Sequence, residues 1–127
     1  MKVIGVQLNE VEAKRLKTAT YTGMDVNLNI ENVGLYKQGI IIDFVHSIAY
    51  QPSIGFLRFY GKVILTDKPI TMKKIVRDWK KSKLLPHELT NAVANIINST
   101  VCLNGVYVCR SINLPAPVFP INVELRK

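Results

Sequence analysis

Residues 39–66 decide the fold, and they read GIIIDFVHSIAYQPSIGFLRFYGKVILT. In both halves of this stretch apolar side chains recur at every second position, which is the period of a β-strand. The tripeptide Gln51-Pro52-Ser53 between the halves combines residues that are typical of tight turns. The stretch therefore predicts two long antiparallel strands, residues 39–50 and 54–66, joined as a hairpin.

Both faces of the predicted hairpin carry apolar side chains. A sheet that is apolar on both sides needs cover on both sides, and two helices can cover only one. The other side must meet a loop, the C-terminal strip, another subunit or an apolar ligand, and we favour another subunit. We expect the core face to hold Ile40, Ile42, Phe44, Ile48, Tyr50, Leu57, Phe59, Val63 and Leu65, and the opposite face to hold Phe56, Arg58, Tyr60, Lys62 and Ile64 with Ile41, Val45 and Ala49.

Two further strands are predicted upstream of the hairpin. Residues 24–31 alternate cleanly between apolar and polar side chains, and residues 2–8 are also rich in strand-forming residues. Residues 9–17 carry several charges and are expected to form a short helix or a loop.

Downstream of residues 67–69 the apolar period changes to that of a helix. A first helix of about twelve residues, capped by Thr71 or a neighbour, is expected to end at Leu84-Leu85-Pro86. A second helix of about 24 residues begins at Pro86, and prolines keep the chain extended from Asn113 onward. The expected apolar stripe of the second helix is Leu89, Ala92, Val93, Ile96, Ile97, Thr100, Leu103 and Tyr107.

Together these elements predict one α+β domain over residues 1–127. It has a four-stranded antiparallel sheet followed by two helices and a Pro-rich extended C-terminus. The length of 127 residues suits a single domain. An apolar fraction of 48% and a charged fraction of 20% exclude a disordered or collagen-like chain.

The positive charge is concentrated in one short region. The net charge is +8, and seven of the seventeen Lys and Arg residues lie between Lys68 and Lys83, where Asp78 is the one anion. Such a cluster can attract nucleic acid, an anionic membrane or an acidic partner, or it can be a solvated helix face. Trp79 could stack on a base or dock the helix on the sheet. The candidate nucleic-acid-binding residues are Lys73, Lys74, Arg77, Lys80, Lys81 and Lys83.

The remaining signals predict neither a cofactor nor a metal. Cys102 and Cys109 would lie about 10 Å apart on one helix, too far for a disulfide. Free cysteines, no signal-peptide pattern and no long unbroken apolar run predict a cytoplasmic protein without a membrane span. The sequence contains no phosphate loop or nucleophile elbow. A third alternative, an enzyme, would use His46 as a base with Asp43 or Asp67.

The order of elements resembles the SecB-like fold of export chaperones, and small archaeal proteins would show the same pattern. The resemblance is carried by residues 44–50, by Pro52-Ser53-Ile54-Gly55, by residues 56–65 and by Leu114-Pro115-Ala116-Pro117-Val118-Phe119-Pro120. It implies a cytosolic protein whose sheets pair between subunits and which holds unfolded polypeptide. Family members that work with a translocation motor are acidic, whereas this chain is basic, so the acidic docking surface for the motor is not expected here.

The leading hypothesis is therefore a non-enzymatic, homo-oligomeric binding protein that holds unfolded or apolar polypeptide segments. Its candidate binding residues are Tyr50, Phe56, Tyr60 and Ile64. The alternative hypothesis is a non-specific nucleic-acid-binding protein that uses the basic helix at residues 68–83.

Overall fold

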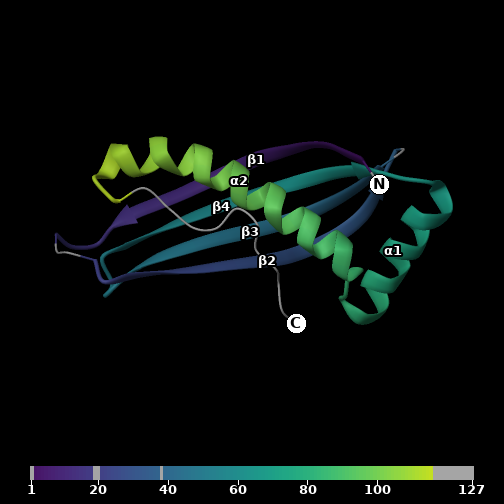
Figure 1. Cartoon of the computed structure of the whole chain (residues 1–127), viewed down its shortest axis with the longest axis horizontal. Helices are drawn as coiled ribbons and strands as arrows, with labels where there is room; N and C mark the ends of the chain where they lie inside the picture. The colour runs from purple at the N-terminus through teal and green to yellow at the C-terminus, as the bar shows by residue number, and fades with distance from the viewer. Residues whose placement is uncertain (1, 19–20, 38, 116–127) are drawn as a thin grey trace.

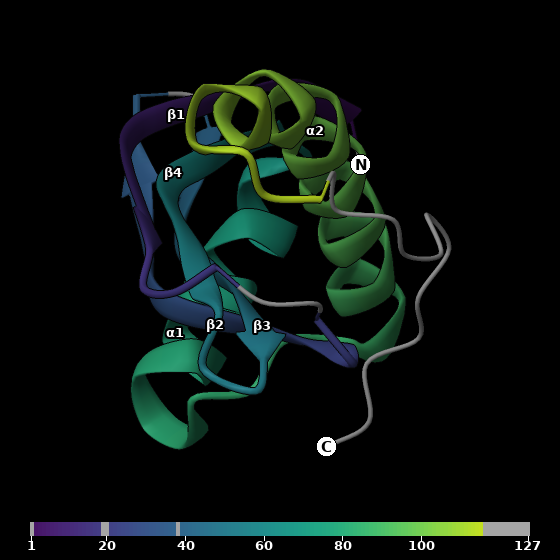
Figure 2. The ribbon, with the colours of Figure 1, turned by 90° about the vertical axis from the view of Figure 1, so that its left-hand side faces the viewer.

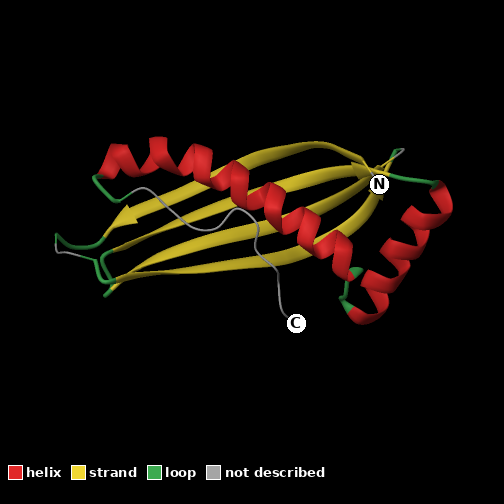
Figure 3. Cartoon of the chain, viewed as in Figure 1, coloured by secondary structure: helices red, strands yellow, loops and turns green. Residues whose placement is uncertain are grey.

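The computed structural model describes residues 2–18, 21–37 and 39–115. A four-stranded antiparallel sheet is followed by two helices, as the sequence predicts (Figures 1 and 3). The Pro-rich C-terminus expected from Asn113 onward lies almost entirely outside the described residues. The elements are β1 (Lys2–Arg15), β2 (Gly23–Tyr36), β3 (Gly39–Gln51), β4 (Gly55–Thr66), α1 (Pro69–Ser82) and α2 (His87–Ile112).

The strands lie in the order β1-β4-β3-β2, so the hairpin that decides the fold forms the centre of the sheet. Its register pairs Val45 with Tyr60 and Ile48 with Leu57. The turn falls at residues 52–54, one position later than the predicted Gln51-Pro52-Ser53. The first strand crosses over to pair with β4, and β2 pairs with β3, so β1 and β2 are the two edges.

The strands upstream of the hairpin are longer than the sequence suggests. The prediction of a helix or loop at residues 9–17 is wrong, because β1 continues to Arg15. The apolar alternation of β1 is broken by register shifts around Ile4 and Asn9, which are typical of β-bulges. A similar shift near Glu31 hides the continuation of β2 as far as Tyr36.

One face of the sheet is covered by α2, which runs obliquely across it (Figures 1 and 2). The first helix, α1, lies at one end of the sheet and contacts β2 and β3. It begins directly at Pro69 after Lys68, without a side-chain cap, so the expected cap at Thr71 is wrong. Proline suits this first helical position because its missing N–H has no intrahelical partner there.

The predicted apolar stripe of α2 is wrong at Ala92, which is exposed, and in its second half. Leu103 and Tyr107 are each 72% exposed, whereas Val101 and Cys109 are buried. The buried side of α2 also contains polar and small residues, which the spacing of apolar residues alone does not predict. The residues buried along α2 are Leu89, Thr90, Val93, Ala94, Ile97, Asn98, Val101, Gly105 and Cys109.

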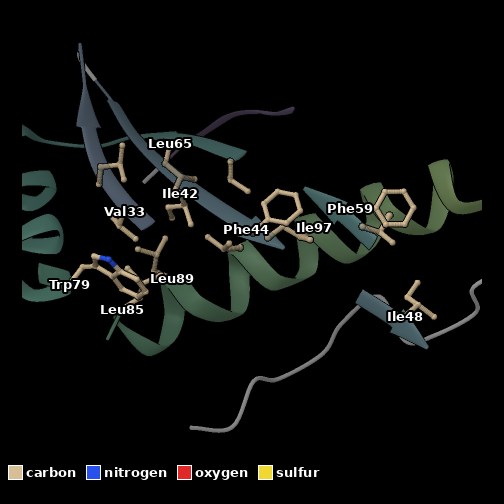
Figure 4. Packing of buried hydrophobic residues seen from close by; sticks show 14 of the residues in the cluster. Val33, Ile42, Phe44, Ile48, Phe59, Leu65, Trp79, Leu85, Leu89 and Ile97 are labelled. Atoms are coloured by element: carbon tan, nitrogen blue, oxygen red, sulfur yellow. The ribbon is translucent and has the colours of Figure 1, made fainter. Parts of the chain in front are cut away.

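The core lies between α2 and the covered face, which we call the inner face (Figure 4). Nine residues expected there are buried: Ile40, Ile42, Phe44, Ile48, Tyr50, Leu57, Phe59, Val63 and Leu65. Phe44 pairs with Gly61 across the hairpin, and a Cβ at Gly61 would lie 2.9 Å from the Phe44 ring. Glycine at this position therefore makes room for the ring.

Candidate functional site

No helix in the described part of the chain covers the opposite face of the sheet, which we call the outer face. Its central side chains are partly exposed. Every outward residue of β3 and β4 is of intermediate exposure. The register places apolar side chains opposite each other at three levels, with polar pairs between them. The apolar pairs are Ala49–Phe56, Val45–Tyr60 and Ile41–Ile64, and the polar pairs are Ser47–Arg58 and Asp43–Lys62.

Polar rows on the two edge strands flank this central stripe. On β2 the outward residues opposite Ala49, Ser47 and Val45 are Asp25, Asn27 and Asn29. On β1 the residues registered with Phe56, Arg58, Tyr60 and Lys62 are Lys14, Glu12, Glu10 and Gln7. An apolar centre inside a polar rim is the usual arrangement of a protein-binding surface.

Glu12 fixes two of the central side chains. Its carboxylate accepts a 2.9 Å hydrogen bond from the Tyr60 hydroxyl and lies 3.6 Å from a guanidinium nitrogen of Arg58. Arg58 in turn lies over the Phe56 ring, 5.1 Å from its centroid. The hydrogen bond to Glu12 raises the pKa of Tyr60 above its usual value. Phe56 and Tyr60 are therefore held in place by charged neighbours on a largely open face.

Ile64 lies where the outer face meets a hollow of about 830 Å³. The hollow is lined by Val3 and Ile4 of β1, by Tyr36 and Lys37, and by Ile64 itself. Tyr36 is 55% exposed and Ile4 is 61% exposed. The apolar character of the stripe thus continues past Ile64 to the end of the sheet.

Tyr50 does not belong to this surface. It lies on the inner face, is 1% exposed, and is separated from Phe56, Tyr60 and Ile64 by the sheet itself. Its hydroxyl donates a 2.6 Å hydrogen bond to the Pro115 carbonyl oxygen and lies 3.3 Å from Cys109 Sγ. Burial is the main cause that raises the pKa of Tyr50. Strand alternation explains the correction, because Tyr50 has the same parity as the core residue Ile48.

The basic helix α1 carries all of its predicted cations at the surface. Its buried side chains are Met72, Ile75, Val76 and Trp79. Trp79 is 6% exposed and docks the helix on the core, so it is not available to stack on a base. Lys83 lies over its ring, 5.6 Å from the centroid. The exposed cations are Lys73, Lys74, Arg77, Lys80, Lys81 and Lys83.

The catalytic pair suggested for the enzyme alternative does not form. His46 is fully buried on the inner face, whereas Asp43 lies on the outer face and is registered with Lys62. Asp67 lies beyond the end of β4 and accepts a hydrogen bond from the backbone N–H of Lys68. The Nε2 atom of His46 lies 3.0 Å from Asn98 Oδ1, and burial lowers the pKa of His46.

Within the described ranges, no three His, Cys, Asp or Glu residues gather as a metal site would require. Cys102 and Cys109 both lie on α2, and neither forms a disulfide. In the part of the chain that the structure describes, α2 alone has the length and hydropathy of a membrane span. Its buried side chains pack on the sheet, as those of a core helix do.

Two features of the site were missed in the sequence. Glu12, which orients Tyr60 and Arg58, lies where a helix or loop was expected, and Asn98, the partner of His46, interrupts the apolar pattern of α2. Neither pairing has a local signal, because each joins residues that are about fifty positions apart.

No family model, no curated protein and no solved structure matches this chain.

Proposed function

We propose that the protein is a non-enzymatic binding protein that holds extended, apolar polypeptide segments on the outer face of its sheet. The observation that carries this proposal is the row of three apolar pairs along β3 and β4, partly exposed and flanked by polar edge rows. This proposal keeps Phe56, Tyr60 and Ile64 as binding residues and drops Tyr50, which is buried on the other face.

The spacing of the stripe suits an extended ligand. Successive apolar pairs are four residues apart along β4, which is about 14 Å at the rise of a β-strand. An extended polypeptide laid along β4 would meet an apolar pair at intervals of about four of its own residues. Its backbone groups could be satisfied by the polar pairs in between, such as Ser47–Arg58.

A homo-oligomer is part of the proposal, and its subunits would pair through an edge strand of the sheet, so that the outer face stays free for polypeptide. An oligomer in which two outer faces met would bury Phe56 and Tyr60 and leave no free surface for a polypeptide. The mass in solution, measured by light scattering, must therefore accompany each binding experiment.

A second candidate function, non-specific nucleic-acid binding, rests on the six candidate cations from Lys73 to Lys83, all of which are exposed. Cations three and four residues apart on one helix can contact successive phosphates. Because Trp79 is buried, this mode would rest on charge and not on base stacking.

The two candidates are separated by one set of anisotropy titrations at about 50 and 300 mM salt, a range over which phosphate contacts weaken sharply. The probes are a labelled unfolded apolar polypeptide and a labelled single-stranded oligonucleotide. The variants are Tyr60→Asp, which disrupts the outer face, and the double variant Lys80→Glu/Lys81→Glu, which reverses charge on α1.

The proposal predicts polypeptide binding that survives 300 mM salt, is lost in Tyr60→Asp and is retained in the double variant. Each variant is thus the control for the other surface. Polypeptide binding that Tyr60→Asp leaves intact would overturn the proposal. Oligonucleotide binding that is lost at high salt and in the double variant would establish the second candidate.

A further inference from the structure

A groove of about 550 Å³ lies between the edge strand β2 and the corner that joins α1 to α2. One wall is made by residues 26–31 of β2, and the other by Trp79, Leu84 and Leu85. Val26 is 42% exposed and Leu84 is 51% exposed, so apolar side chains on both walls are open to solvent. We call this the β2 groove; the β2 residues that line it are Val26, Asn27, Leu28, Asn29, Ile30 and Glu31.

Trp79, which lines this groove, carries a buried hydrogen-bond donor without an acceptor. The indole Nε1 of Trp79 is buried and has no hydrogen-bond partner among the described residues. Leaving such a group without a partner is unfavourable, because burial removes its hydrogen bonds to water and nothing replaces them. Trp79 lies beside Leu85 and Leu89 at this corner of the core (Figure 4). A backbone carbonyl of an extended segment in the groove would supply the missing acceptor.

The sequence of this chain contains a segment with the matching pattern. Residues 116–127 read APVFPINVELRK, and Pro117 and Pro120 exclude a helix there. Ile121, Val123 and Leu125 alternate with Asn122, Glu124 and Arg126, which is the pattern of a strand with one apolar side.

The segment starts within reach of the groove. Leu114 is buried, and the Pro115 carbonyl is held by Tyr50, which is registered with Met24 near the start of β2. From Met24 to Ile30 the strand runs about 20 Å. Twelve extended residues reach about 40 Å, so the apolar positions of the segment can lie along β2.

We infer that residues 116–127 dock in the β2 groove of their own chain, with Ile121, Val123 and Leu125 toward Trp79 and Leu84. Charges agree with this placement, since Lys83 and Glu31 line the groove and the segment carries Glu124 and Arg126. The docked segment also covers an edge strand whose outward backbone groups would otherwise attract other chains. This inference stands apart from polypeptide binding on the outer face.

Trp79 makes the inference directly measurable, because it is the only tryptophan of the chain. The two test variants are Val123→Asp and Asn122→Asp in the full chain. Each adds one negative charge to the segment, but only Val123 lies on its apolar side. We expect Val123→Asp to shift Trp79 emission to longer wavelength and to raise acrylamide quenching about twofold, because the groove opens locally. Asn122→Asp is expected to match the parent.

A chain that ends at Pro115 provides a second variant and should behave like Val123→Asp. Equal emission and quenching in the parent, Val123→Asp and the shortened chain would overturn the inference, as would equal effects of the two Asp variants. The measurements are repeated over a range of protein concentrations with the mass followed by light scattering, and docking within one chain predicts a Trp79 signal that does not depend on concentration. Protection of Trp79 that appears only in a dimer would assign the groove to the segment of a second copy and overturn docking within one chain.

Discussion

Both faces of the central hairpin carry apolar side chains, nine on the inner face and six on the outer face, but their surroundings are very different. Phe59 on the inner face is fully buried beneath the helices, whereas Phe56, three positions away on the same strand, is partly exposed. Strand alternation separates the two sets of residues, and helix packing decides which set becomes core. The apolar residues on the outer face are therefore expected to contribute less to stability than those on the inner face, which makes them candidates for binding.

The largest contrast is expected between two phenylalanines on β4. Phe59→Ala removes a fully buried ring, and we expect it to lower the free energy of unfolding by about 3–5 kcal/mol. Phe56→Ala, on the outer face, should cost within about 1 kcal/mol. Urea unfolding followed by circular dichroism measures both. Similar losses in the two variants would show that the outer face is also core.

The buried histidine gives the inner face a pH dependence. Burial lowers the pKa of His46, so the unfolded chain binds a proton at a higher pH than the folded chain does. The free energy of unfolding should therefore fall as the pH drops through about 6.5, the ordinary value for histidine. Urea unfolding at pH 7.5 and 5.5 tests this.

The His46→Gln variant should lose most of this pH dependence, whereas His87→Asn, at an exposed position, should keep it. A parent protein that is equally stable at both pH values would contradict the account of the buried His46–Asn98 pair.

Two tyrosines test the same contrast with a smaller expected effect. Tyr50→Phe removes the hydrogen bond to the Pro115 carbonyl, and we expect a loss of about 1 kcal/mol in the free energy of unfolding. Tyr60→Phe removes only the partly exposed hydrogen bond to Glu12 and should be less destabilising. Thermal unfolding ranks the two; a greater loss in Tyr60→Phe would contradict the assignment of faces.

The smallest expected effect comes from Glu12. Glu12→Gln weakens the contact with Arg58, whose side chain is 39% exposed, and should change the free energy of unfolding by less than about 0.5 kcal/mol. Urea unfolding at low and high salt measures it. A larger, salt-sensitive loss would mean that the outer face contributes to folding.

The hairpin was predictable because apolar side chains recur at every second position over most of its length, and the helices were predictable because that period changes after residues 67–69. The extent of β1 was not, since the shifts near Ile4 and Asn9 break the alternation that marks a strand. The face of α2 was only half predictable, because burial of Asn98 and Gly105 depends on the sheet beneath them.

The candidate binding site, like the fold, was predictable only in part. Alternation placed Phe56, Tyr60 and Ile64 together on one face, and the same rule places Tyr50 on the other. The hydrogen bond between Tyr60 and Glu12 joins two segments that are far apart in the sequence, and the same is true of the β2 groove. Such contacts leave no pattern in a single sequence.

Isoleucine methyl NMR tests the central claim most directly, because isoleucines lie on both faces of the hairpin. Ile41 and Ile64 lie on the outer face, and Ile40, Ile42 and Ile48 lie in the core. During titration with an unfolded apolar polypeptide, the account predicts shifts at Ile41 and Ile64 while Ile40, Ile42 and Ile48 stay unchanged. Shifts confined to the core isoleucines or to Ile75 of α1, with Ile41 and Ile64 unmoved, would contradict it.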